Sequence, residues 1–398
     1  MYIDDMEIAM KKWVLAAGVS AMATGAAHAQ SSVTLFGLID EGFNYTNNVG
    51  GHPLYAMSSG DVQGSRWGLR GSEDLGGGLA AIFKLESGFN VNNGRLGQQG
   101  REFGRQAYVG VSSTQYGTLT FGRQYDSVTD YLTSLTANGS WGGGMFSHPY
   151  DNDNTDDTFR LSNAVKYASI DYHGFSFGGM YAFSNDTNFG LNRAVSAGAQ
   201  YTSGPLTVAA AYLDIDNPNA NTSGAVSIGP NGSGDGSWTA RRQRIYGAGI
   251  NYTIGKTTLG FAYTRTDLAQ PTGTQYANLA ANAALGTASD LRFNNFEVNA
   301  LYQFTPAFFV GGMYTYTQMT YAGSTGQSAK PKYHQFGLMA DYLLSKRTDV
   351  YAQAAYIQVA DAGAAAGTGL EVASNPDTAG PSSTNRQVMA RVAIRHKF

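Results

Sequence analysis

Residues 388–398 read VMARVAIRHKF and form the last segment of the sequence. In an extended chain, successive side chains point to opposite faces. One face of this segment is largely apolar and consists of Val388, Ala390, Val392, Ile394, His396 and Phe398. The other face carries most of the polar groups and consists of Gln387, Met389, Arg391, Arg395 and Lys397. The pattern predicts a β-strand with one oily side, and the rest of the chain must show which solvent surrounds it.

Sixteen segments with this alternation, each roughly ten residues long, follow one another after residue 30. They are 33–46, 62–72, 78–89, 102–113, 116–124, 160–172, 175–184, 193–203, 206–214, 241–253, 256–267, 291–304, 307–320, 332–344, 348–360 and 385–398. An even number of antiparallel strands closes into a barrel with both termini at one rim. The last strand then pairs with the first, 33–46, so that no strand edge stays unpaired in lipid.

The connections between these segments alternate between two lengths. Short, turn-forming connections fall at 72–78, 114–115, 173–174, 204–205, 254–255, 305–306 and 345–348. Long polar connections fall at 47–61, 90–101, 125–159, 185–192, 215–240, 268–290, 321–331 and 361–384. Short turns on one rim and long loops on the other are typical of outer-membrane barrels. The sequence therefore predicts an all-β fold, a 16-stranded antiparallel transmembrane β-barrel with short periplasmic turns and long external loops.

The composition agrees with a barrel in a membrane. Only 14% of the 398 residues are charged, while glycine reaches 51 and tyrosine 25. Outward rows such as Phe296, Val298 and Tyr302 alternate with polar residues, and aromatic residues near strand ends are typical of interfacial girdles. The net charge of −3 gives no polyelectrolyte attraction for nucleic acid. The absence of cysteine excludes disulfide and thiol chemistry.

The N-terminal residues predict export. Met10-Lys11-Lys12 is a basic start, residues 13–23 are apolar or small, and Ala27-His28-Ala29 fits a signal-peptidase site. We expect residues 1–29 to be an extension plus signal peptide that is removed. Residues 30–398 are then expected to form a single barrel domain in the cell outer membrane.

Three motifs occur in order along the first third of the chain: SRWGLRGSEDLG at 65–76, RQAYVGV at 105–111 and YGTLTFGRQY at 116–125. They resemble the Gram-negative general porins, particularly the β-proteobacterial branch, and the resemblance extends from residue 31 to Phe398. It implies a homotrimer whose third loop, about 125–159, folds into the pore. It also implies passive diffusion of ions and small hydrophilic solutes without a cofactor. The implied partners are outer-membrane lipid, lipopolysaccharide and the barrel-assembly machinery, for which Phe398 is the C-terminal assembly signal.

Basic side chains occur on strand faces that are predicted to line the lumen. Arg66 and Arg70 alternate with Trp67 and Leu69, so both arginines face the lumen if the apolar pair faces lipid. By the same alternation, Lys84 lies opposite its apolar neighbours at 83 and 85. Strand alternation leaves the direction of Arg105 ambiguous. The resemblance implies that Arg105 and Arg160 are both arginines of the pore wall. The candidate basic residues of the pore constriction are Arg66, Arg70, Lys84, Arg105 and Arg160.

Acidic candidates occur opposite these cations. Glu86 shares the lumen face of Lys84, and Asp126 and Asp130 open the third loop four residues apart, on one face of a helical turn. Charges of opposite sign across a narrow pore would set up a transverse field that selects small polar solutes. Five cations against the three acids Glu86, Asp126 and Asp130 suggest a weak anion preference. Asp40 and the acidic run from 151 to 157 would instead favour cations.

The acidic run Asp151, Asp153, Asp156 and Asp157 has two interpretations. It is a solvated loop, which is the more common role of such runs, or it binds a divalent cation at the mouth. No other metal spacing occurs, and no GxSxG or HExxH motif indicates an enzyme. We therefore predict a general diffusion porin, with no catalytic residue, metal or cofactor. The alternatives are a substrate-specific channel and a barrel that acts mainly as an adhesin or envelope anchor.

Overall fold

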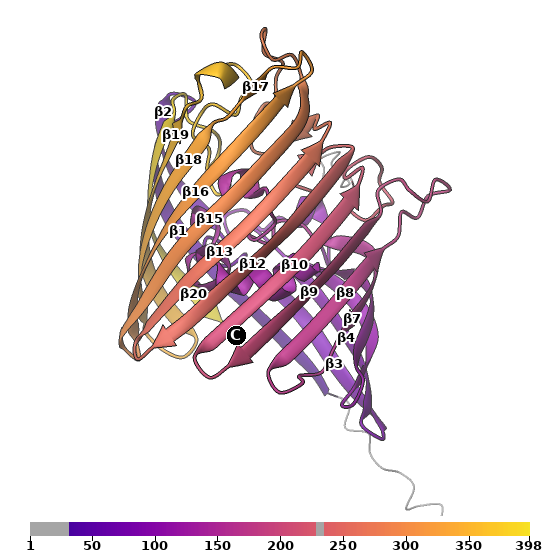
Figure 1. The fold of residues 1–398 in the computed structure, drawn as a ribbon. Coiled ribbons are helices and arrows are strands. Elements are labelled where there is room, and N and C mark those ends of the chain that lie inside the picture. Colours follow the sequence, from indigo (N-terminus) through magenta and orange to yellow (C-terminus); the bar gives the residue numbers. More distant parts are fainter. Residues whose placement is uncertain (1–31, 228–234) are drawn as a thin grey trace, which may run out of the picture.

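The structure is a computed structural model that describes residues 32–227 and 235–398. The predicted signal peptide, 1–29, lies outside the described residues. The chain forms one closed barrel of sixteen antiparallel strands, and the long connections all lie at one rim (Figure 1). No helix among the described residues is long and apolar enough to cross a membrane.

The strand bounds follow the predicted segments closely. The strands are β1 (Ser32–Val49), β2 (His52–Ser59), β3 (Arg66–Gly76), β4 (Leu79–Gly88), β5 (Gln106–Ser113), β6 (Gly117–Gln124), β7 (Leu161–Ala168), β8 (Phe175–Ala182), β9 (Ala194–Ser203), β10 (Leu206–Asp216), β11 (Trp238–Thr239), β12 (Arg242–Ile254), β13 (Thr257–Ala269), β14 (Gly273–Thr274), β15 (Ala288–Thr305), β16 (Phe308–Gly323), β17 (Ser328–Ala329), β18 (Lys332–Leu343), β19 (Thr348–Ala360) and β20 (Arg386–Lys397). In the barrel wall, β2 and β3 together form the second of the sixteen strands. The short strand β17 pairs with the end of β16, and β11 and β14 pair with each other outside the barrel sheet.

Pairing between the two ends of the chain closes the barrel. The register between β1 and β20 runs from Leu38 opposite Lys397 to Thr46 opposite Met389. Beyond β20, Phe398 exchanges two backbone hydrogen bonds of 3.0 Å with Gly37. The opening segment therefore does not end in a free edge, which confirms the closure predicted from its alternation.

The faces of the strands are those predicted. On β20, Val392 is 58% exposed on the outside whereas Arg391 is 4% exposed on the inside. On β15, Phe296, Val298 and Tyr302 point outward, and Glu297 is fully buried between them on the inner side. A row of apolar side chains thus covers the outside while polar side chains line the interior, the reverse of a water-soluble protein.

One predicted loop is wrong at its boundaries. The connection 47–61 contains β2, which pairs with the upper half of β1, and the predicted strand 62–72 begins only at β3. Between them, residues 60–65 bend inward, because the carboxylate of Asp40 accepts hydrogen bonds from the backbone N–H of Val62 (3.0 Å) and Gln63 (2.9 Å). The buried Asp40 of β1 therefore stabilises the interruption between β2 and β3. The alternation of polar and apolar residues does not reveal this interruption.

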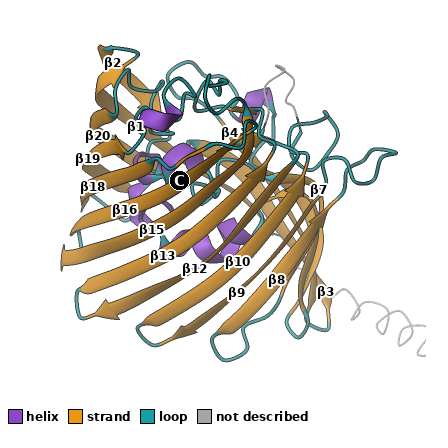
Figure 2. Ribbon diagram, turned by 45° about the horizontal axis from the view of Figure 1, so that its top comes forward, coloured by secondary structure: helices purple, strands orange, loops and turns teal. Residues whose placement is uncertain are grey.

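The third loop lies inside the barrel (Figure 2). Its short helical turns are η2 (Val128–Leu132), η3 (Thr133–Leu135), η4 (Asn138–Gly142), η5 (Gly144–Phe146) and η6 (Pro149–Asp151). Two further short turns, η1 (Gln98–Gly100) and η7 (Gly363–Ala365), belong to other loops. The inward path that the resemblance implied is present.

Inward-facing glycines make room for the third loop along the wall. A Cβ on Gly247 of β12 would lie 2.9 Å from Leu132, and one on Gly249 would lie 3.0 Å from Leu135. Wall amides add hydrogen bonds to the loop backbone, such as Gln353 Nε2 to the Gly142 carbonyl at 2.6 Å. The loop is therefore packed and hydrogen-bonded against β12 to β19 rather than loosely suspended.

We expect Gly311→Ala to destabilise the folded barrel by about 1–3 kcal/mol, the usual cost of overpacking. The added Cβ would lie 2.7 Å from the ring of Trp141 in the third loop. The heat required to convert the purified protein from its folded to its unfolded electrophoretic form measures the effect. The control is Gly312→Ala on the outer face, whose Cβ would lie 3.3 Å from the end of Leu338 and 3.8 Å from the Gly337 carbonyl oxygen. Equal losses in both variants would show that the third loop does not fill the space at Gly311.

Candidate functional site

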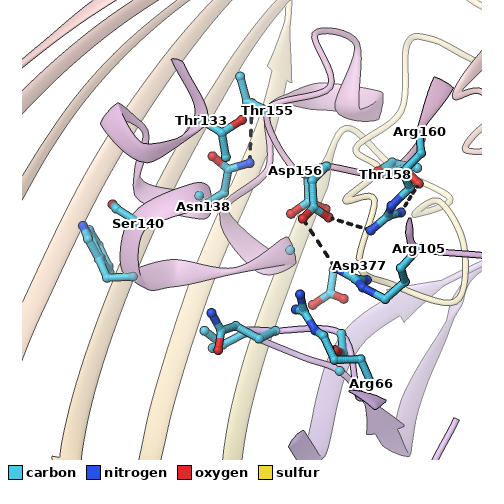
Figure 3. Close-up of a pocket in the computed structure, with 18 of the residues that line it drawn as sticks. Arg66, Arg105, Thr133, Asn138, Ser140, Thr155, Asp156, Thr158, Arg160 and Asp377 are labelled. Carbon is cyan, nitrogen blue, oxygen red and sulfur yellow. Dashed lines mark hydrogen bonds and ion pairs between the residues drawn. The ribbon is translucent and has the colours of Figure 1, made fainter. Parts of the chain in front are cut away.

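A polar cavity of about 310 Å³ lies between the third loop and the opposite wall. Figure 3 shows Arg66, Arg105 and Arg160 around the carboxylates of Asp156 and Asp377 at this cavity. The basic side is formed by Arg66 at the start of β3, Arg105 directly before β5 and Arg160 directly before β7. The acidic side is formed by Asp156 and Asp157 near the end of the third loop and Asp377 from the last long loop, and Arg395 also lines the cavity.

Glu86 organises the basic side. Its carboxylate accepts a hydrogen bond of 2.7 Å from Arg105 Nε and lies 2.6 Å from Lys84 Nζ and 3.6 Å from Arg66 Nη1. One buried carboxylate thus serves three cations, which keeps the arginines together against their mutual repulsion. The structure places Glu86 within the arginine wall, next to the cavity rather than across it.

Tyr125 joins two of the arginines. Its hydroxyl oxygen accepts hydrogen bonds from Arg105 Nη2 at 2.6 Å and from Arg160 Nη2 at 2.5 Å. The Arg160 guanidinium also lies over the ring, 4.6 Å from the centroid. Sequence reasoning assigned no role to Tyr125, although it ends the third motif of the resemblance.

Two predicted cations lie away from the cavity. Arg70 and Lys84 are paired across β3 and β4 and face the lumen nearer the turn rim. Both lie over the ring of Phe36, with Arg70 Cζ at 5.5 Å and Lys84 Nζ at 5.2 Å from its centroid. The structure therefore brings Arg66, Arg105 and Arg160 together. Arg70 and Lys84 form a second basic pair in the lumen, nearer the turn rim.

The two acids at the start of the third loop do not reach the cavity. Asp126 is fully buried and accepts hydrogen bonds from the N–H of Val128 at 2.7 Å and from Asn154 Nδ2 at 2.8 Å. Burial raises the pKa of Asp126 to about 6. Asp130 forms an ion pair with Lys166 of β7. Both acids hold the base of the loop, and the acids that face the arginines come from its far end.

The acidic run is not a solvated loop. Asp151 and Asp153 are fully buried, so this interpretation is wrong for both. The chain folds back here through left-handed residues, with φ of +61° at Tyr150 and +38° at Asp151, which turns the carboxylates inward. Among the described residues, no group of acidic or histidine side chains is placed to hold a metal ion.

Comparison with known proteins identifies the fold and its family. The family model of the Gram-negative porins matches residues 15–362. An outer membrane porin of Bordetella pertussis is 35% identical over 87% of this chain and 94% of its own length. The outer membrane porin protein 32 of Delftia acidovorans is 29% identical over 98% of this chain and all of its own. The chain belongs to the Gram-negative porin family.

A solved structure has the same fold. The structure of an anion-selective porin from Comamonas acidovorans superposes with a TM-score of 0.70 over 93% of this chain and all of that one, at 24% identity. This porin is an integral protein of the outer membrane and a general diffusion channel, as its motifs implied. Its family consists of channels rather than enzymes.

A buried histidine pins the third loop of the porin to the wall. His148 lies between two carboxylates, with Nδ1 at 2.6 Å from Asp153 and Nε2 at 3.2 Å from Glu297 of β15. Burial lowers the pKa of His148, but the charge and hydrogen bond of Asp153 outweigh it and hold the pKa at about 10. Sequence reasoning missed this group, because Glu297 lies 149 residues after His148 in the sequence and only the closed barrel brings the two together.

The carboxylates near the end of the third loop are expected to lose charge as the pH falls. Burial, together with the charge of Asp153, raises the pKa of Asp151 to about 7. Burial and neighbouring carboxylates also raise the pKa of Asp156 well above its ordinary value. Protonation therefore removes negative charge as pH falls from 8 to 5, where an ordinary aspartate would stay ionised. The zero-current potential under a KCl gradient should move toward chloride over that range.

Replacing the titrating group provides the control for this pH dependence. Asp151→Asn should already show at pH 8 part of the shift that the unmodified porin shows on acidification, because the pKa of Asp151 is about 7, and its remaining pH dependence should be smaller. An unmodified porin whose zero-current potential is the same at pH 8 and pH 5 would contradict the expectation.

Proposed function

We propose that this porin is weakly anion-selective, with Arg66, Arg105 and Arg160 as the basic side of its constriction. Asp156 and Asp157 of the third loop are the opposing acids. The observation that carries the proposal is the convergence of the three guanidinium groups on one polar cavity within the lumen. Glu86 positions the arginines, whereas Asp126 and Asp130 anchor the loop.

The charge balance supports anions. Four arginines and three aspartates line the cavity. Asp157 is shared by two of these arginines, 3.6 Å from Arg105 and 3.4 Å from Arg160. An anion that leaves the cavity toward the turn rim next meets Arg70 and Lys84. The surplus is small, so the preference is weak, and the transverse field orders small polar solutes of either charge.

The related structure supports the same direction, since the similar protein from Comamonas acidovorans is an anion-selective porin. A substrate-specific channel would show conductance that saturates with one solute, and an anchor or adhesin would conduct poorly. We also propose that residues 1–29 are an export signal that is removed and that residues 30–398 form one domain. Phe398 is then the C-terminal signal that the barrel-assembly machinery recognises.

We further propose a homotrimer that forms through the face of β18, β19, β20 and β1. A depression of about 650 Å³ lies there, lined mainly by apolar side chains that include Phe43, Ala352 and Val392. Glu41 of β1 lies on the same face, and its Oε2 is buried without a hydrogen-bond partner in the described part of the chain. A carboxylate on a lipid-facing surface is unfavourable. A second copy would cover it, whereas lipid, including lipopolysaccharide, would surround the remaining faces.

Selectivity variants test the constriction. Arg160→Gln should shift the zero-current potential toward potassium and Asp157→Asn toward chloride, since each removes one charge from the cavity. A unit charge ~8 Å from a passing ion changes its energy by about 0.5 kcal/mol in water, which is roughly twofold in local concentration. Planar-bilayer recordings under a KCl gradient measure both effects. Asp130→Asn is the control, because its carboxylate pairs with Lys166 outside the cavity. Equal shifts of the zero-current potential in all three variants would show that other residues determine the selectivity. An unmodified protein that does not conduct would contradict the channel function.

Cysteine labelling tests the trimer face, because the chain contains no cysteine. Val392 of β20 and Ile250 of β12 are both exposed on the outside of the single barrel, at 58% and 40%. Val392→Cys should react slowly with a membrane-soluble maleimide in the assembled protein, and Ile250→Cys should react rapidly. Equal rates would exclude this face as the interface.

A further inference from the structure

Tyr125 lies at the junction between the pore wall and the third loop. It follows β6 directly, and its backbone carbonyl accepts a hydrogen bond of 3.0 Å from Lys166 Nζ of β7. Lys166 also forms an ion pair with Asp130, which lies in the first helical turn of the loop. The backbone of Tyr125 is therefore held both by the wall and by the base of the third loop.

The Tyr125 hydroxyl is an acceptor that two cations share. Arg105 Nη2 lies 2.6 Å and Arg160 Nη2 lies 2.5 Å from its oxygen. Guanidinium groups repel each other, and these two Nη2 atoms are separated by little more than this one oxygen. Two further hydrogen bonds fix each arginine separately, from Arg105 Nε to Glu86 at 2.7 Å and from Arg160 Nη1 to the Thr158 carbonyl at 2.9 Å. The hydroxyl thus brings the two guanidinium groups side by side.

Asp157 also faces both arginines, but it holds them more loosely. Its carboxylate lies 3.6 Å from Arg105 Nη2 and 3.4 Å from Arg160 Nη2, and its side chain is 36% exposed. An ion pair that is exposed to water contributes little to the stability of one geometry. The hydrogen bonds to the Tyr125 hydroxyl are shorter and come from charged donors, which makes them stronger than hydrogen bonds between neutral groups.

The hydroxyl differs from a carboxylate in its charge. Burial raises the pKa of Tyr125 in spite of the arginines beside it, so the hydroxyl stays neutral at physiological pH. Glu86, in contrast, offsets the charge of one of the three cations that it contacts. Tyr125 therefore fixes Arg105 and Arg160 without reducing the positive charge that they present to an anion in the cavity.

We propose that Tyr125 is a positioning residue that determines the anion preference of the pore by holding Arg105 and Arg160 side by side. The inference rests on the proposed role of the arginines in selectivity. It adds a residue that carries no charge and lies behind the arginines rather than in the lining of the cavity. A substitution at Tyr125 that leaves every charge of the chain unchanged should therefore alter the ion selectivity.

Tyr125→Phe tests the proposal, because it removes the shared hydroxyl and keeps the ring that lies 4.6 Å from the Arg160 guanidinium. We expect the two guanidinium groups to separate and the chloride-to-potassium permeability ratio to fall by up to roughly twofold, the effect of one displaced unit charge. Zero-current potentials in planar bilayers under a KCl gradient measure this ratio. The matched control is Tyr150→Phe in the same loop. Its hydroxyl lies 3.4 Å from the hydroxyl of Tyr333, and its removal should leave the ratio unchanged.

A double-mutant cycle distinguishes an effect through the arginines from a general distortion of the third loop. In an Arg105→Gln/Arg160→Gln background, Tyr125→Phe should cause no further change in the permeability ratio, because no guanidinium pair remains to be held. A further change of the same size in that background would overturn the proposal. The heat-dependent electrophoretic mobility of each variant shows whether its barrel is folded, and Arg160→Gln alone serves as the background if the double variant does not fold.

The same recordings separate this inference from the proposed function. If Arg105→Gln/Arg160→Gln leaves the permeability ratio unchanged, the arginines do not determine the selectivity, and both the proposed function and this inference fail. If the double variant shifts the ratio toward potassium and Tyr125→Phe does not, the role of the arginines stands and the role of Tyr125 is refuted.

Discussion

Hydrogen bonding of the backbone in lipid is the constraint on which the rest of this porin depends. Hydrocarbon offers no partner to an N–H or C=O group, so a membrane-spanning sheet must close on itself. Here the closure is the pairing of β1 with β20, extended by Phe398 to Gly37. Closure also settles which face of every strand is internal. The arginines of the pore and the aromatic residues of the outer wall follow from that choice.

The enclosed space is then narrowed by contacts of shape and charge. Inward glycines admit side chains of the third loop, while wall amides and Glu297 hold its backbone, as in the 2.7 Å hydrogen bond from the Ala137 N–H. The ion pairs of His148 add a buried electrostatic tie. With no disulfide available, packing and hydrogen bonds hold the constriction rigid.

Carboxylates act as spacers between arginines throughout the molecule. Glu86 serves three cations in the pore wall, and Asp267 serves two on the outer wall. In the pore wall, a shared carboxylate lets guanidinium groups gather without full neutralisation, so a surplus of positive charge remains for a passing anion.

The sequence by itself determined the strands, their faces and the closed barrel, because a period of two and alternating loop lengths are local properties of the chain. It also placed Arg66, Arg105 and Arg160 in the pore wall with the help of the family motifs. Only the tertiary structure decided their partners. Asp156 and Asp157 face the arginines, whereas Asp126 and Asp130 do not, because the path of the third loop depends on wall contacts more than a hundred residues away in sequence, such as Glu297. Spacing along the chain carries no record of such contacts.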